Sequence, residues 1–175
     1  MTNTAALMER NRTIAESHDG KVLPPLPKYR AVVLACGDAR ADPVHALGLE
    51  PGDAVVFRNN GARVTQQILN ELAALALLVG KMDGETPGPF EFIIMQHTQC
   101  GAQRFADPNL QAAVKGMLGI DISESAITDP EADLKADVER VRAFAAIPDY
   151  VTISAYLHNL ETGFAHEVCP PQKLR

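Results

Sequence analysis

Four short runs of apolar, largely β-branched residues recur along the chain, and their spacing constrains the fold most. They cover residues 30–36, 54–58, 91–95 and 151–156. Apolar runs of this length, bounded by turn residues such as Pro51-Gly52, are typical of strands that are buried on both faces. Buried strands of this kind are found in parallel sheets, whose faces are covered by helices. We therefore expect each run to be a strand of one parallel sheet.

The segments between these runs have helical character. Between residues 65 and 80, apolar residues recur at spacings of three and four behind a candidate N-cap, Thr65. Helices are also expected over residues 4–17, in a short piece after residue 36, less regularly from 101 to 118, and from 130 to 145. Strands that alternate with helices predict an α/β fold. We expect a Rossmann-like parallel sheet of about four strands flanked by helices, followed by a hairpin-like end over residues 159–163.

Composition limits the classes of protein to which the chain can belong. Its 175 residues fit a single domain, 1–175, in which residues 1–28 form an N-terminal helix and a proline-rich arm. A net charge of -6 argues against nonspecific nucleic-acid binding, which needs a basic face. No apolar run is long enough to predict a membrane-spanning helix, and the N-terminus lacks the hydrophobic core of a signal peptide. Three cysteines, an odd number, suit a reducing compartment, and we expect a cytoplasmic protein.

Soft metal ligands follow two of the expected strands. Cys36 ends the first, and His97 and Cys100 follow the third. The carboxyl ends of parallel strands meet at one edge of a sheet, so the three side chains are expected to lie together. Two thiolates and one imidazole suit Zn²⁺ and leave a fourth coordination position open, as catalytic zinc sites do. Cys169 is interpreted as a free, exposed thiol, with a role as the fourth ligand as the less favoured alternative.

A series of motifs surrounds these residues. In order, they are Cys36-Gly37-Asp38-Ala39-Arg40, Pro43, His45, Pro51-Gly52-Asp53, Arg58-Asn59 and His97-x-x-Cys100-Gly101. From about residue 30 to residue 101, the chain resembles the β-class carbonic anhydrases. It implies a zinc enzyme that reversibly hydrates carbon dioxide to bicarbonate. It also implies a homodimer or higher homo-oligomer in which the N-terminal helix packs on the partner. Relatives in the same family hydrolyse carbonyl sulfide or carbon disulfide.

The resemblance further implies catalytic roles for Asp38 and Arg40 beside zinc held by Cys36, His97 and Cys100. Zinc lowers the pKa of bound water to roughly 7. Asp38 must stay ionised to accept a hydrogen bond from that bound water, and it must not bind the metal itself. A bidentate ion pair with Arg40 meets both conditions. His45 is a candidate proton shuttle, although a lone histidine is more often a surface residue.

The expected substrate pocket departs from the family pattern at Glu50, Asn60 and Ala102. The resemblance places it among Glu50, Phe57, Asn59, Asn60, Gly61, Gly101 and Ala102. At position 50 the family commonly has glutamine, whose amide can donate to bicarbonate. An ionised Glu50 cannot donate and repels that anion, whereas an uncharged linear substrate is less affected. Carbonyl sulfide or carbon disulfide therefore remains an alternative substrate.

Two further readings lie outside these activities. The first is a non-catalytic, zinc-stabilised protein in which Asp38 or Cys169 closes the metal site. The second is a cysteine-based redox enzyme, which is disfavoured because Cys36 and Cys100 lack the CxxC spacing of thioredoxin-like motifs.

Overall fold

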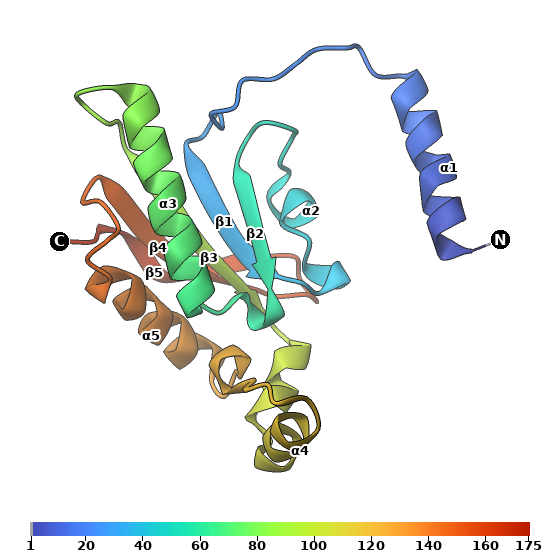
Figure 1. The fold of residues 1–175 in the computed structure, drawn as a ribbon, viewed down its shortest axis with the longest axis vertical. Coiled ribbons are helices and arrows are strands. Elements are labelled where there is room, and N and C mark those ends of the chain that lie inside the picture. Colours follow the sequence, from blue (N-terminus) through green and yellow to red (C-terminus); the bar gives the residue numbers. More distant parts are fainter. Residues whose placement is uncertain (1) are drawn as a thin grey trace.

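The computed structural model describes residues 2–175 and contains one five-stranded sheet in the order β2-β1-β3-β4-β5 (Figure 1). The α/β fold predicted from the sequence is confirmed. The first four strands are parallel, and the fifth is antiparallel to β4. Their bounds are β1 (Ala31–Cys36), β2 (Val55–Asn59), β3 (Phe90–His97), β4 (Val151–His158) and β5 (Ala165–Lys173).

The fifth strand was not expected from the sequence. It contains Pro170 and Pro171, and proline cannot donate to a sheet ladder, which argues against a central strand. β5 lies at the edge of the sheet and pairs only with β4, so residues without an N–H are tolerated there. The expected hairpin-like end is the turn that joins these two strands.

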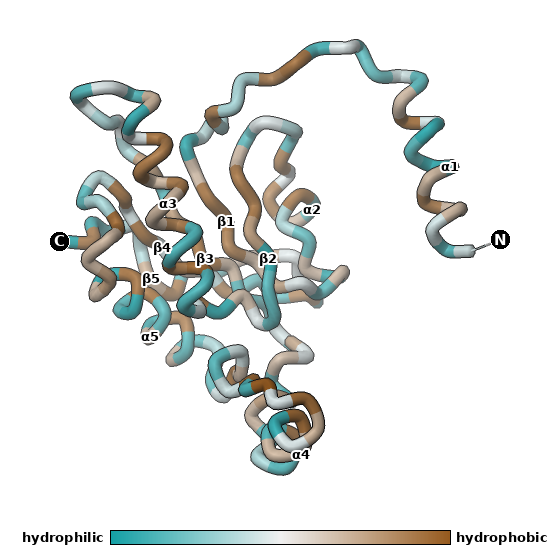
Figure 2. Tube along the Cα trace, in the orientation of Figure 1, coloured by the Kyte–Doolittle hydropathy of each residue, from teal (hydrophilic) through white to brown (hydrophobic). Residues whose placement is uncertain are grey.

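Two helices cover one face of the sheet and pack the main core. α3 (Gln66–Asp83) and α5 (Pro130–Ala143) place Leu72 and Leu134 against the alternate strand residues that include Val32 and Phe92. The opposite face carries a smaller cluster of Val33, Ala35 and Met95 beside the short helix α2 (Pro43–Leu47). Hydrophobic residues follow one another along β1 (Figure 2), as burial on both faces requires.

The limits of α3 agree with the sequence at its start and differ at its end. The Thr65 side chain accepts a hydrogen bond from the Ile68 N–H, which confirms the predicted N-cap. The helix continues beyond Gly80, where the sequence predicted its end, to Asp83. Gly80 does not end the helix. A glycine is required at this position because a Cβ there would collide with the Tyr150 hydroxyl.

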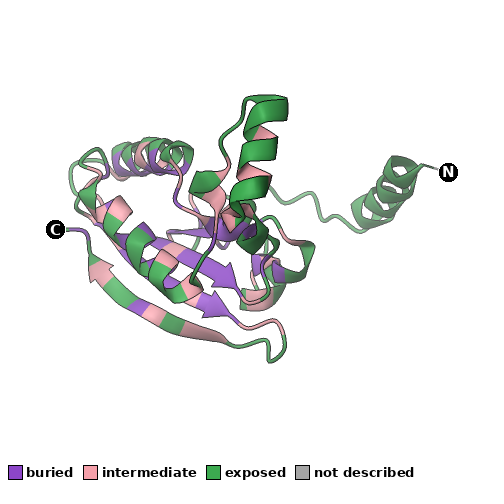
Figure 3. Ribbon diagram, turned by 90° about the horizontal axis from the view of Figure 1, so that it is seen from below, coloured by how far each residue is buried: buried purple, intermediate pink, exposed green. Residues whose placement is uncertain are grey.

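The two outer helices lie away from the main core. α1 (Asn3–Glu16) forms as predicted, and residues 2–25 are all exposed. It stands apart from the sheet in two perpendicular views (Figures 1 and 3). α4 (Pro108–Leu118), which follows a 3₁₀ segment at Gly101–Ala106, has no buried residue. Within residues 2–175, no helix is both long and apolar enough to cross a membrane.

Candidate metal centre

The sheet brings the three predicted metal ligands together. β1 and β3 are parallel neighbours, so Cys36 and His97 end their strands at the same edge, and Cys100 follows in the next turn. The two sulfur atoms and one imidazole nitrogen all lie within 4.8 Å of one another. All three residues are buried, with His97 only 1% exposed. This geometry agrees with the expected Cys-His-Cys metal site.

The local chemistry fits a bound metal ion. His97 Nδ1 lies 2.9 Å from the Thr98 carbonyl oxygen, a contact that places the ring proton on Nδ1 and leaves a lone pair on Nε2. Nε2 is buried and has no hydrogen-bond partner among residues 2–175. The Cys36 and Cys100 sulfurs are 3.6 Å apart. Two sulfurs bound tetrahedrally at about 2.3 Å from zinc would be separated by about 3.8 Å.

The two cysteines are close enough for their protonation to be linked. A hydrogen bond from the Cys100 thiol lowers the pKa of Cys36, and the same contact raises the pKa of Cys100. The pair therefore favours one thiolate even before a metal binds. Because the thiolate is the form that ligates metals, the pair is prepared for a soft cation.

Asp38 and Arg40 form an ion pair beside these donors. Asp38 begins a 3₁₀ turn, Ala39–Ala41, which bends the chain back after β1. Arg40 Nε and Nη2 donate to the two carboxylate oxygens at 3.0 and 2.7 Å. These bonds hold the pKa of Asp38 well below its usual range. One of its oxygens lies 3.9 Å from His97 Nε2, within reach of the donor cluster.

Arg58 supports this turn from β2. Its guanidinium donates to the Cys36 carbonyl at 2.9 Å and to the Asp38 carbonyl at 2.8 Å. It also bonds Asp42 at 3.0 Å. One side chain therefore fixes the backbone on both sides of Gly37.

A cavity of about 360 Å³ opens beside the donor cluster. Four residues predicted for the pocket line it, namely Asn60, Gly61, Gly101 and Ala102, together with Cys36, Gly37 and Asp38. Phe105 also lines this cavity and was missed. It belongs to the 3₁₀ segment after Cys100, where no motif marks it.

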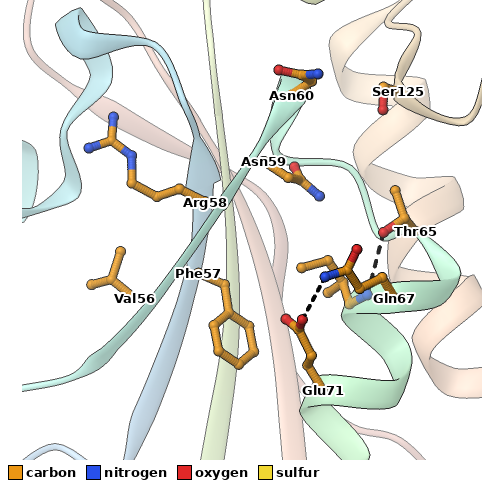
Figure 4. Close-up of a pocket in the computed structure, with 10 residues that line it drawn as sticks. Val56, Phe57, Arg58, Asn59, Asn60, Thr65, Gln67, Glu71 and Ser125 are labelled. Carbon is orange, nitrogen blue, oxygen red and sulfur yellow. Dashed lines mark hydrogen bonds between the residues drawn. The ribbon is translucent and has the colours of Figure 1, made fainter. Parts of the chain in front are cut away.

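Two more of the predicted pocket residues line a separate cavity. Phe57 and Asn59 border a space of about 460 Å³ between β2 and α3, and Asn60 lines both this cavity and the metal pocket (Figure 4). Glu50 lines neither. It is exposed and precedes β2, whereas the metal cluster lies at the carboxyl end of that strand.

His45 and Cys169, the remaining candidates, lie outside the metal pocket. His45 is exposed and lines a cavity of about 280 Å³ with Arg40 and His158. Cys169 is a free thiol, as expected, but the prediction that it is exposed was wrong. It is buried in the main core, because it pairs with Ala155 of β4.

Comparison with known proteins agrees with this geometry. The family model described as carbonic anhydrase matches residues 31–155. The chain is 30% identical over 172 residues to β-carbonic anhydrase 1 of Mycobacterium tuberculosis, covering 97% of this chain and all of that protein. It is 31% identical to a carbon disulfide hydrolase of Acidithiobacillus thiooxidans, covering 79% of this chain and 77% of that protein.

A solved structure shares the whole architecture. The carbonic anhydrase from Streptococcus mutans superposes with a TM-score of 0.81 at 29% identity, covering 96% of this chain and 98% of that one. A family match over most of the chain and a relative matched along its full length lead to one conclusion. This chain belongs to the β-class carbonic anhydrase family, which has carbon disulfide hydrolases among its relatives.

Proposed function

We propose that the protein is a zinc enzyme that reversibly hydrates carbon dioxide to bicarbonate. The observation that carries the proposal is the buried Cys36-His97-Cys100 cluster with the ion-paired Asp38 carboxylate at its edge. Three protein donors leave a fourth position for a small molecule, which is the arrangement of catalytic zinc sites. When bound, zinc would act as a Lewis acid that lowers the pKa of a coordinated water to roughly 7.

Asp38 is the residue proposed to orient the nucleophile. Its carboxylate stays ionised at neutral pH, because Arg40 holds its pKa far below 7. An ionised carboxylate can only accept hydrogen bonds, so Asp38 would turn the water O–H toward itself and the oxygen lone pair toward the substrate. This role needs a carboxylate at a fixed position.

Arg40 is proposed to fix that position. Besides its two bonds to Asp38, its Nη2 donates to the Gln99 carbonyl at 3.1 Å, which ties the pair to the turn before Cys100. A bidentate pair also keeps Asp38 from turning toward the metal ligands only 3.9 Å away. Arg40 would in this way keep the fourth position open.

The adjacent cavity suits a small neutral substrate. Gly61, Gly101, Ala102 and Phe105 present apolar atoms next to the donor cluster, and Asn60 adds a polar side chain at its border. Carbon dioxide is linear, uncharged and small enough for such a space. The product is an anion, for which Asn60 offers an amide donor.

Hydrolysis of carbon disulfide or carbonyl sulfide is the second candidate. The apolar lining of the cavity would also accept these linear molecules, and a relative matched at 31% identity is named a carbon disulfide hydrolase. The same Asp38 and Arg40 would orient water in either reaction.

A paired assay separates the two activities. Carbon dioxide hydration is followed by stopped flow with a pH indicator, and hydrogen sulfide release from both sulfur substrates is followed on the same zinc-replete sample. We expect rapid hydration that disappears in Cys36→Ser and persists in Cys169→Ser, whose thiol lies outside the cluster. Rapid sulfide release with negligible hydration would refute carbon dioxide as the substrate.

We also propose that the chain forms a homodimer through α1. Residues 2–25 are exposed, and α1 carries the exposed apolar side chains Leu7, Met8 and Ile14. A second copy of the chain would cover them.

We further propose that the protein is cytoplasmic. Thiols that ligate a metal must stay reduced, and all three cysteines are free.

A further inference from the structure

The turn Asn60–Ala62 forms one wall of the metal pocket in an unusual conformation. Gly61 has a φ of 76° and Ala62 a φ of 52°, both in the left-handed region. This region is costly for alanine, so surrounding contacts must hold the turn in place. The turn is also packed tightly. A Cβ on Gly61 would lie 3.0 Å from Ala102 Cβ and 3.1 Å from Ile127 Cδ1.

The next residue, Arg63, fastens this turn to α5. Its Nε donates to Asp137 Oδ2 at 2.7 Å, and its Nη2 donates to the other oxygen at 3.3 Å. Nη1 lies 3.3 Å from Asp133 and also donates to the Ala126 carbonyl. The Arg63 side chain is 14% exposed and that of Asp137 only 2%, so this is an ion pair shielded from solvent.

The Arg63 backbone connects the ion pair to the metal ligands through Asn59. The Asn59 side chain accepts from the Arg63 N–H at 3.1 Å and donates to the Arg63 carbonyl at 2.7 Å. The Asn59 carbonyl then accepts from the Gly37 N–H at 2.8 Å, directly after Cys36. A continuous series of bonds therefore joins α5 to the end of β1.

A second series of hydrogen bonds reaches the segment that follows Cys100. Ala126, whose carbonyl accepts from Arg63, precedes Ile127, and the Ile127 N–H donates to the Ala102 carbonyl at 3.3 Å. Ala102 stands two residues after Cys100. Figure 4 shows Ser125, in the same segment as Ala126, across the cavity between β2 and α3 from Asn59 and Asn60. One guanidinium thus connects the segments that follow both cysteines.

The turn held by Arg63 also borders the donor cluster. Gly61 lines the metal pocket together with Cys36 and Gly37. Groups that pack around a metal ligand orient it and tune how strongly it donates to the metal. The position of Gly61 beside Cys36 depends on the turn that Arg63 fixes.

We infer that Arg63 is a positioning residue for the metal centre: its ion pair with Asp137 holds the Asn60–Ala62 turn and, through Asn59, the backbone that follows Cys36. Arg63 itself does not line the pocket, so it would act through the turn. The inference deepens the proposed function, on which it rests for the identity of the bound ion. It predicts that changes at Arg63 alter the metal–thiolate bond, although the side chain lies outside the pocket.

The test replaces Arg63 and observes the metal directly. Arg63→Met removes the charge at similar length. Arg140→Met is the matched control, because Arg140 joins the same helix to Glu124 through a pair on the surface. The cobalt-substituted proteins are compared by their thiolate-to-cobalt charge-transfer absorption. Zinc affinity is measured by competition with a chromogenic chelator.

We expect Arg63→Met to shift the charge-transfer band and to weaken zinc binding about tenfold, a typical effect of losing an outer partner of a metal ligand. Arg140→Met should change neither. If the Arg63→Met variant folds and keeps the same spectrum and zinc affinity, the inference is overturned, even if the variant is less stable.

Arg63→Lys gives the same test if the methionine variant does not fold. Lysine keeps the charge but cannot make both bonds to Asp137, so a smaller shift in the same direction supports the inference and an unchanged band overturns it. Neither readout needs turnover. A protein inactive toward carbon dioxide that still shows the shift would refute the proposed function and leave the role of Arg63 standing.

Discussion

Removal of the Arg40 side chain tests the proposed role of the ion pair. We expect Arg40→Ala to lower hydration about 10²- to 10⁴-fold, because Asp38 can then turn toward the donor cluster. Zinc content should stay near one per chain. Stopped-flow rates and elemental analysis check this, with Arg12→Ala, which removes an exposed guanidinium on α1, as the control. Loss of the metal itself would show that Arg40 is structural.

The residues at the centre differ in how far the sequence could predict them. Cys36, His97 and Cys100 were predictable, because each lies at or just after a strand end that the hydrophobic pattern identifies. Arg63 gave no such signal. Its partner Asp137 is 74 residues away, and their contact depends on how α5 packs on the sheet. Side chains marked by local pattern can be found from sequence, but those defined by distant contacts cannot.

Two glycines with similar positive φ values test the crowding at the pocket wall. Gly61 has a φ of +76° and close neighbours, whereas Gly163 has a φ of +73° and open space where a Cβ would lie. Gly163→Ala should lower the free energy of unfolding by about 1–2 kcal/mol, the cost of the left-handed region for alanine. Gly61→Ala should cost about 1–3 kcal/mol more from overpacking. Urea unfolding measures both, and equal losses would contradict the account.

At the scale of elements, burial decided what could be predicted. β1 and β3 were identified because they are buried on both faces and read as continuous apolar runs. β5 was missed, since an exposed edge strand with two prolines has no such pattern. The end of α3 was misplaced because Gly80 serves contact with Tyr150, a residue distant in the sequence.

Deletion of α1 tests the proposed dimer. Residues 2–17 are exposed and contribute nothing to the buried core of this chain, so their removal should leave the fold and the metal site intact. We expect the molar mass measured by light scattering to fall from dimer to monomer while the circular dichroism of the remaining chain persists. An unchanged dimer would place the interface on another surface.

At the scale of the whole molecule, the metal is expected to contribute to stability. The donor cluster joins β1, β3 and the turn after β3, and these segments separate on unfolding. A ligand that binds only the folded state stabilises it by about 2.7 kcal/mol at a hundredfold excess over its Kd. The metal should therefore connect the chemistry of the site to the stability of the fold.

Metal removal tests this connection. Treatment with a chelator should lower the urea midpoint, and added zinc should restore it. The effect should be absent in His97→Ala, which lacks one donor. It should also weaken as the pH falls, because protons compete with the metal for the thiolates and the imidazole. A midpoint that does not respond to chelator would contradict a metal that is bound by the folded state.

The coordination sphere of the metal tests the central claim most directly. X-ray absorption of the freshly purified protein at neutral pH should show about one zinc per chain with two sulfur atoms at about 2.3 Å and two lighter atoms, one nitrogen and one oxygen, at about 2.0–2.1 Å. Protein that carries no zinc and takes up none when it is supplied would contradict the account, as would a shell of four sulfur atoms.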